Sequence, residues 1–150
     1  MTTPYDVPAD DLIEEIAKKL EKDTNIETPE ENLYSKTGVD RESPPTNKNW
    51  WYIRCAAILR KVYMKNHIGV ERMSAEFGGK HDRGSKPHRA AAGSGTIARR
   101  AFQQLEKAGY MTKIKGKGRM LSPKGRSFMD NISKEVINHI KNDYPGLDKY

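Results

Sequence analysis

The 150-residue sequence predicts a mainly α domain: a helical bundle around a central amphipathic helix, winged-helix-like, with a short β-hairpin wing. Three observations predict it. Apolar residues recur at helical spacing in four long segments, a Gly-Lys-Gly turn signal separates two alternating runs between the last two segments, and the helix before that turn contains adjacent arginines. Helices followed by a basic two-stranded hairpin are typical of a winged helix-turn-helix. A chain of this length buries roughly 68–70% of its unfolded surface, so the fold needs no disulfide or metal.

The charge is divided unevenly along the chain, although the net charge is only +7. Residues 1–46 hold 5 Lys/Arg and 12 Asp/Glu, whereas residues 47–150 hold 22 Lys/Arg and 8 Asp/Glu. We therefore expect a single domain over 1–150, made of an acidic N-terminal helix and linker (1–46) and a basic winged-helix core (47–144). A domain with such a cationic excess attracts polyanions through counterion release.

Several function classes find no support in the sequence. The single cysteine, Cys55, has no disulfide partner, which favours a reducing compartment, and its apolar neighbours indicate a small buried hydrophobe. No stretch approaches the ~20 apolar residues of a membrane span. The histidines have no Cys/His partners at metal-binding spacing; they are His67, His81, His88 and His139. We expect a soluble intracellular protein with no membrane association, cofactor or metal, and no catalytic site, because no nucleophile–base pair is suggested.

The first 49 residues predict one helix and a long connection. Residues 8–22 place acids first and lysines last, which suits the helix dipole, and Leu12, Ile16 and Leu20 fall on one face. Residues 23–49 are polar and contain prolines and a glycine, which indicates an irregular connection. We expect the helix to pack on the domain and the acidic segment to lie mainly away from a bound polyanion, because like charges repel.

The segment 50–65, WWYIRCAAILRKVYMK, combines aromatic, aliphatic and basic residues in one predicted helix. At about 100° per residue, Trp51 and Ile58 fall in one apolar sector, which Tyr52 and Tyr63 extend. A second apolar strip lies on the far side of the helix. Such a helix is packed by protein over most of its circumference, so the aromatic side chains are expected to serve as core rather than as stacking platforms for bases.

The cations of the same helix form a narrow seam. Arg54, Lys61 and Lys65, at i, i+7 and i+11, lie within ~40° of one another between the two apolar strips. We call these three residues the cationic seam; Arg60 stands separately, beside the second strip. A solvated charged face would contain acids among the cations, and none occurs from 50 to 70. We therefore expect the seam to be exposed and to contact an anionic partner.

The next segments predict a short helix and a loop. Residues 70–77 have a helical pattern that Gly78-Gly79 ends. The stretch 78–95 indicates a basic, glycine-containing loop, which we expect to be mobile until a phosphate backbone orders it. Its Gly84-Ser85-Lys86 lacks the Gly-Lys-Ser/Thr ending of a P-loop, so a nucleotide site is not expected there.

A second strong helix is predicted over residues 94–108. Either Ser94 or Thr96 can cap its start, Gly109 can end it, and Leu105 belongs to its apolar stripe. The following YMTKIKGKGRML alternates in two short runs around Gly-Lys-Gly, which is a hairpin signal.

The last long helix begins at Ser122-Pro123, because serine suits the cap and proline the first turn. Pro145-Gly146 is expected to stop it, since proline cannot continue a helix.

Four blocks of residues carry a family resemblance. They are Asn49-Trp50-Trp51-Tyr52-x-Arg54-x-Ala56 continuing through Arg60 to Tyr63, Gly69-Val70 with Met73 and Phe77-Gly78-Gly79, Ile97-Ala98-Arg99-Arg100 with Gln104-Leu105-Glu106, and Gly118-Arg119-x-Leu121-Ser122-Pro123-x-Gly125. In this order and spacing, the chain resembles the archaeal and eukaryotic ribosomal protein S19e family of the small subunit. The blocks lie between residues 49 and 125, and the resemblance covers roughly residues 5–142. Together the blocks are specific, whereas one alone is not.

The resemblance implies a mostly helical, winged-helix-related fold around the helix at 49–66. It also implies a structural component of the head of the small ribosomal subunit that binds ribosomal RNA, located in the cytoplasm on the ribosome. Neighbouring small-subunit ribosomal proteins are implied partners, the free protein is expected to be a monomer, and a role in subunit assembly and RNA maturation follows from eukaryotic relatives. The alternative from the fold pattern is a winged-helix DNA-binding transcription regulator, which is expected to dimerise on paired half-sites.

The residues and the resemblance together predict which side chains form the core and which bind RNA. The predicted core residues are Trp51, Tyr52, Ile58, Tyr63 and Leu105. The predicted RNA-binding cations lie on the central helix, the 78–95 loop, the second helix and the wing: Arg54, Arg60, Lys61, Lys65, Arg83, Lys86, Arg89, Arg99, Arg100, Lys115, Lys117 and Arg119. Such cations position a protein on the phosphate backbone, and arginine can do so with a forked, bidentate contact.

Overall fold

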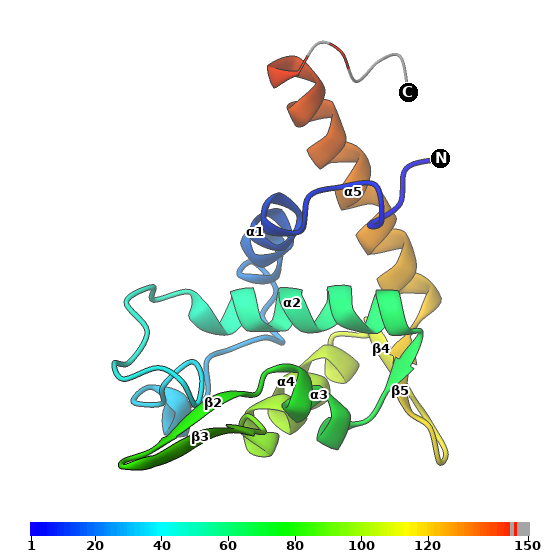
Figure 1. Cartoon of the computed structure of the whole chain (residues 1–150). Coiled ribbons are helices and arrows are strands. Elements are labelled where there is room, and N and C mark those ends of the chain that lie inside the picture. Colours follow the sequence, from blue (N-terminus) through cyan, green and yellow to red (C-terminus); the bar gives the residue numbers. More distant parts are fainter. Residues whose placement is uncertain (145, 147–150) are drawn as a thin grey trace.

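Five α-helices and two small antiparallel sheets make up residues 1–144 and 146, which are the residues that the computed structural model describes (Figure 1). The helices are α1 (Ala9–Leu20), α2 (Trp50–Lys65), α3 (Val70–Glu76), α4 (Gly95–Lys107) and α5 (Pro123–Asp143), with a short 3₁₀ turn η1 (Glu30–Asn32). The strands are β1 (His67–Ile68), β2 (Gly79–Arg83), β3 (Lys86–Ala91), β4 (Met111–Ile114) and β5 (Gly118–Leu121). About half of the chain is helical, so the fold is a mixed helical one with more strand than the sequence predicted.

Helix α2 crosses the middle of the molecule and the other elements pack around it (Figure 1). Helix α1 and the outer part of α5 lie on one side, and α3, α4 and both hairpins lie on the other. Trp51, Ile58 and, from α4, Leu105 are fully buried, whereas Tyr52 and Tyr63 are partly buried against this core. The apolar sector of α2 therefore faces protein, because burying aromatic and aliphatic surface is the main favourable term in folding.

Polar tips of the core aromatic residues find partners inside the protein. The Trp51 Nε1–H donates to Gln104 Oε1 at 2.8 Å, and the Tyr63 hydroxyl donates to Asp130 Oδ1 at 2.9 Å. Burial, and then the bond to Asp130, raise the pKa of Tyr63 to about 12. These bonds tie α2 to α4 and to α5, and a paired polar tip is what allows such a ring to be buried.

The elements from α2 to β5 are arranged in a way that is consistent with the predicted winged helix. The small three-stranded sheet has the order β1-β5-β4, with His67 opposite Met120 and Met111 opposite Leu121. Strand β1 is only two residues long and was not predicted, because so short a strand leaves no alternating pattern. Gly118 lies at this junction with φ +93°, and a Cβ there would lie 2.5 Å from the Ile68 carbonyl oxygen.

The stretch 78–95 is a β-hairpin, β2–β3, and not the predicted mobile loop. The Gly84-Ser85 turn closes it, with Gly84 at φ +75° and its N–H donating to Asp82 Oδ1 at 2.9 Å. Its base is attached to α3, where the Gly93 N–H donates to the Ser74 carbonyl at 2.9 Å. Both faces of the hairpin are mostly exposed, so hydrophobic alternation is missing. The signal that could have revealed it is the two-residue Gly-Ser turn.

The acidic segment is packed on the domain. Leu12, Ile16 and Leu20 of α1 are fully buried, which confirms the predicted apolar face. The connection from 23 to 49 is largely irregular, as predicted, but it lies on the domain: Ile26 is buried, and Gln104 Nε2 donates to the carbonyl of a linker residue, Glu27, at 2.8 Å.

The predicted helix ends agree with the structure where it describes them. Ser94 caps α4 by accepting from the Ile97 N–H, and Gly109 follows the helix at φ +85°. Ser122 caps α5 by accepting from the Gly125 N–H at 3.0 Å. Helix α5 ends at Asp143; the predicted stop at Pro145-Gly146 includes Pro145, which lies outside the described residues.

Candidate nucleic-acid interface

Arg54, the first residue of the cationic seam of α2, is packed against other parts of the protein. The Arg54 Nη2 donates to the Thr37 carbonyl at 2.6 Å, and the guanidinium stacks on the Phe77 ring with a carbon-to-centroid distance of 4.1 Å. Burial lowers the pKa of Arg54. The expectation that Arg54 is exposed is therefore wrong, because the linker and the end of α3 fold over it. Sequence periodicity within α2 cannot show which other segments pack across a helix.

The other two residues of the seam share one acid. Lys61 Nζ donates to Glu76 Oε2 at 2.9 Å, and Lys65 pairs with the other oxygen of the same carboxylate. These contacts, Lys65 first and then Lys61, lower the pKa of Glu76 to about 2. The seam therefore does have an acid beside it, which α3 supplies from outside the window 50–70. Contact of these lysines with an anionic partner stays a prediction. The ammonium groups keep part of their exposure, with side chains 31% and 47% exposed.

Two further predicted cations pair with acids of the protein, and a third is half-buried. Arg100 pairs with Glu31 of the acidic segment, and the Arg119 Nε donates to Glu106 Oε1 at 2.7 Å, with that arginine side chain only 14% exposed. Arg60 is half-buried, and its Nε is buried without a hydrogen-bond partner among the described residues. An ion pair fixes the position of its arginine, so Arg100 and Arg119 are held in place before any ligand binds.

The β2–β3 hairpin carries cations that no described residue neutralises. Lys86 and Arg89 are exposed and make no hydrogen bond or ion pair with residues 1–144 or 146, whereas the Arg83 Nε donates to the Pro87 carbonyl at 2.9 Å within the hairpin. Lys80, on β2, is exposed in the same way and was not predicted. The basic composition of residues 78–95 could have identified Lys80, since every basic residue on an exposed two-stranded hairpin can reach a phosphate backbone.

The wing, β4–β5 and its turn, carries a second set of free cations. Lys115 and Lys117 are exposed, and neither pairs with any residue in the described part of the chain. Lys113, on β4, is exposed as well, and Arg72 of α3 lines with Lys117 a hollow of about 370 Å³ between the start of α3 and the wing turn. Lys113 and Arg72 were missed by sequence reasoning. Arg72 comes close to the wing only through the tertiary fold.

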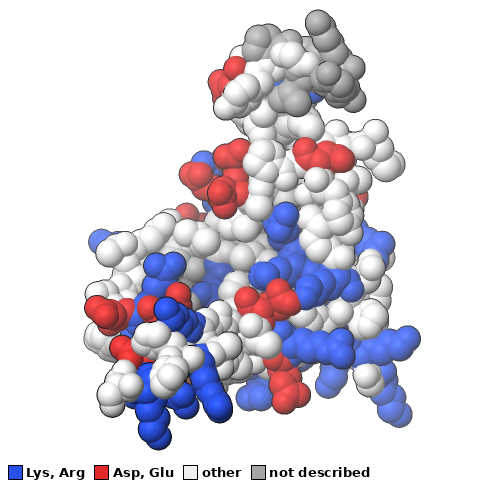
Figure 2. Space-filling view, in the orientation of Figure 1, with Lys and Arg blue, Asp and Glu red and all other residues white. Residues whose placement is uncertain are grey.

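The free cations of the two hairpins lie at one end of the molecule. Helix α4, which carries the exposed Arg99, lies between the two hairpins in Figure 1. Figure 2 shows most of the visible Lys and Arg in the half that holds the hairpins, where some Asp and Glu lie among them, whereas the visible charged residues around α1 are mainly Asp and Glu. Two basic ribbons flanking a helix can contact an extended polyanion at several points at once, and multiple phosphate contacts are the main source of affinity for nucleic acid.

Other chemistries have little to build on in the described residues. No helix there is long and apolar enough to cross a membrane. Residues 1–144 and 146 contain no group of three or more His, Cys, Asp or Glu placed to hold a metal ion. Cys55 is fully buried, and burial raises the pKa of its thiol to about 12, so it is a core side chain, as predicted, and is not poised as a nucleophile.

Comparison with known proteins places this basic-ended fold in a family. The family model of ribosomal protein S19e matches residues 3–139. The chain belongs to the ribosomal protein S19e family. It is 47% identical over 144 residues to the small ribosomal subunit protein eS19 of Thermoplasma acidophilum, a match that covers 96% of this chain and 95% of that one.

Two further relatives widen the range of the S19e family around this chain. The small ribosomal subunit protein eS19 of Aeropyrum pernix is 40% identical over 152 residues, covering 100% of this chain and 99% of its own. The protein of the same name from Entamoeba histolytica is 42% identical over 131 residues, covering 87% and 84%. The resemblance predicted from the four sequence blocks is therefore confirmed.

Proposed function

We propose that this S19e family member is a structural, non-catalytic component of the small ribosomal subunit and binds ribosomal RNA through its hairpin end. Relatives named small ribosomal subunit protein eS19 align with this chain over 95% and 99% of their own length. This likeness supports a place on the ribosome in the cytoplasm. A place in the head of the subunit and a part in subunit assembly and RNA maturation belong to the same proposal.

The observation that carries the RNA-binding proposal is the contrast in pairing. The side chains of the hairpin cations other than Arg83 and Arg119 have no hydrogen-bond or ion-pair partner in the described chain, whereas on α2 Lys61 and Lys65 pair with Glu76 and Arg54 bonds to the linker. Unpaired exposed cations at one end of a domain cost self-repulsion, which a phosphate backbone relieves. The proposed contacts are therefore ranked, with the hairpin and wing cations and Arg99 first and the paired cations second.

The proposed mode of recognition is by backbone and shape. Arg89 and Arg99 can each grip a phosphate with two parallel N–H bonds, whereas Lys86, Lys115 and Lys117 act as point charges. These contacts fix the position of the protein on RNA without reading its sequence. A second group of cations contributes charge but is less available to RNA, because its members are ion-paired or, for Arg60, half-buried: Arg60, Lys61, Lys65, Arg100 and Arg119.

Purification of the tagged protein from its native cells, with sequencing of the attached RNA, tests the proposal. Small-subunit ribosomal RNA is expected as the dominant species. Duplex DNA or messenger RNA in its place would contradict the proposal and favour the winged-helix transcription regulator.

Matched charge variants test the location of the surface. We expect the double variants Lys86→Gln/Arg89→Gln and Lys115→Gln/Lys117→Gln each to weaken binding of the purified protein to small-subunit ribosomal RNA about tenfold at physiological salt. The control, Lys22→Gln/Lys134→Gln, removes two exposed charges, one just after α1 and one on α5. It should change affinity less than about twofold. Equal losses in all three variants would show that only net charge matters.

A further inference from the structure

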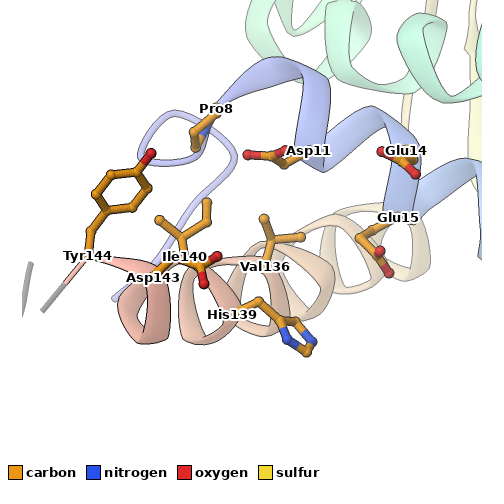
Figure 3. Close-up of a pocket in the computed structure, with 9 residues that line it drawn as sticks. All are labelled: Pro8, Asp11, Glu14, Glu15, Val136, His139, Ile140, Asp143 and Tyr144. Carbon is orange, nitrogen blue, oxygen red and sulfur yellow. The ribbon is translucent and has the colours of Figure 1, made fainter.

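A groove between α1 and α5 lies at the opposite end of the molecule from the hairpins (Figures 1 and 3). Its cavity has a volume of about 460 Å³. Val136 and Ile140 of α5 point toward α1 and form an apolar floor, and Pro8 and Tyr144 flank its outer end (Figure 3). Lys19 of α1 pairs with Glu135 of α5. This ion pair joins the two helices at the end of the groove opposite Pro8 and Tyr144.

The rim of this groove is acidic. Asp11, Glu14 and Glu15 contribute carboxylates from α1, and Asp143 contributes one from α5 (Figure 3). Glu14 and Glu15 share one ammonium group, that of Lys18, at 3.3 and 2.8 Å.

The two remaining carboxylates of the rim have no partner in the part of the chain that the structure describes. Asp11 and Asp143 are exposed and make no hydrogen bond or ion pair with residues 1–144 or 146. They stand on opposite helices, so they lie on the two sides of the apolar floor. The side chain of His139, also on α5, lies at the edge of the groove (Figure 3).

We propose that this groove docks a Lys/Arg-rich segment of another protein of the small subunit, with one apolar side chain of that segment seated on Val136 and Ile140. This inference rests on the proposed function, since the subunit supplies the neighbour. Charge complementarity selects the partner: unpaired carboxylates on both sides of an apolar strip match cations that flank an apolar residue. The same carboxylates repel a phosphate backbone, so RNA is not the occupant.

The geometry of the whole molecule agrees with this division. The basic hairpins and the acidic groove lie at opposite ends of the structure (Figures 1 and 2). RNA bound at the hairpin end therefore leaves the groove accessible to a protein segment, and the same long-range charge separation steers a basic segment to it.

Binding of a synthetic peptide to the purified full chain tests the groove without a ribosome. The probe is a short fluorescent peptide that alternates Arg-Lys pairs with leucine; one control peptide has serine for leucine, and another has glutamate for the cations. We expect Asp11→Asn/Asp143→Asn to weaken binding of the basic, leucine-containing peptide about fivefold, the effect of two exposed charge pairs. The matched control Glu42→Gln/Glu71→Gln removes two exposed charges elsewhere and should change it less than about twofold. Equal losses in both double variants, or equal binding of the serine peptide, would overturn the proposal.

A photo-crosslinking residue at position 14, introduced into assembled small subunits, identifies the occupant. Crosslinks to Lys/Arg-rich peptides of another small-subunit protein are expected, with none of these peptides captured from position 42. Crosslinks to ribosomal RNA or to a second copy of the chain would overturn the proposal. Failure of the chain to enter subunits, with peptide binding intact, would instead contradict the proposed function, so the two failures can be told apart.

Discussion

The cations of α2 and those of the two hairpins differ in what surrounds them. Both regions are rich in lysine and arginine, and both were predicted to face RNA. In the structure, Arg54 stacks on Phe77, and Lys61 and Lys65 share Glu76, whereas the hairpin lysines project without partners in the described chain. The same residue types therefore serve two purposes. On α2 they join the helix to the linker and to α3, and on the hairpins they offer free charge to a ligand.

The number of cations on a segment therefore does not decide their role. Their role depends on whether the tertiary fold places an acidic or apolar side chain against them. Glu76 pairs with two lysines of a seam that has no acid of its own, whereas Lys86 and Arg89 of the β2–β3 hairpin stay exposed and without a partner among the described residues.

Removing the core aromatic residue of α2 should have the largest effect. Trp51 is fully buried and its Nε1–H is bonded to Gln104, so Trp51→Ala should lower the free energy of unfolding by ~3–5 kcal/mol through the cavity it leaves. The measurement is urea unfolding followed by circular dichroism, with Trp51→Phe as a milder control that keeps most of the ring volume. A stable Trp51→Ala protein that has lost RNA affinity would show that the ring acts in binding.

Reversing the charge of Arg54 should destabilise the protein. Arg54→Glu removes the bond to Thr37 and the stacking on Phe77 and puts a carboxylate beside a carbonyl oxygen, so we expect a loss of ~2–4 kcal/mol in unfolding free energy. The exposed Arg99 is the matched control, because Arg99→Glu should change stability by less than ~0.5 kcal/mol. If both variants melt like the wild type, Arg54 does not hold the linker and belongs with the free cations.

The salt dependence of RNA binding should separate the wing from the seam. Removing two wing charges, Lys115→Gln/Lys117→Gln, should reduce the slope of log K against log salt by about 1.4–1.8, since each phosphate contact contributes ~0.7–0.9. Lys61→Gln/Lys65→Gln should reduce it by less than about half of that, because Glu76 already neutralises part of their charge. The measurement is RNA affinity between low and physiological salt. An equal reduction from both pairs would mean that phosphate displaces Glu76 and that the seam is part of the interface.

The smallest effect concerns the pH dependence of the Glu76 ion pairs. The pKa of Glu76 is lowered in the folded protein from 4.5 to about 2, so the folded state favours the charged carboxylate, and its stabilisation is complete above about pH 4.5 and is lost as the pH falls toward 2. Because the three side chains are partly exposed, solvent screening limits the contribution to ~0.5–1 kcal/mol. Wild type and Glu76→Gln should therefore differ in urea stability at pH 6 and converge near pH 2, with a smaller difference at 1 M salt. A difference that persists at pH 2 would contradict this account.

The parts of the fold that the sequence predicted well are those that rest on local patterns. The apolar face of α1, the Ser94 and Ser122 caps, and the wing around Gly-Lys-Gly all depend on residues within a few positions of one another. The two-residue strand β1 and the exposed β2–β3 hairpin were not predicted, because neither buries an alternating apolar face.

Composition, capping and periodicity are properties of neighbouring residues, so the family, the central helix, its buried face and the basic character of residues 47–144 could be predicted from the sequence alone. Which cations remain free depends on how the elements pack. Arg54 meets Thr37 across 17 positions of the chain, and Arg100 meets Glu31 across 69. Contacts at such separations are set by how the elements pack, and a wheel drawn for one helix contains no information about the segments that will lie against it.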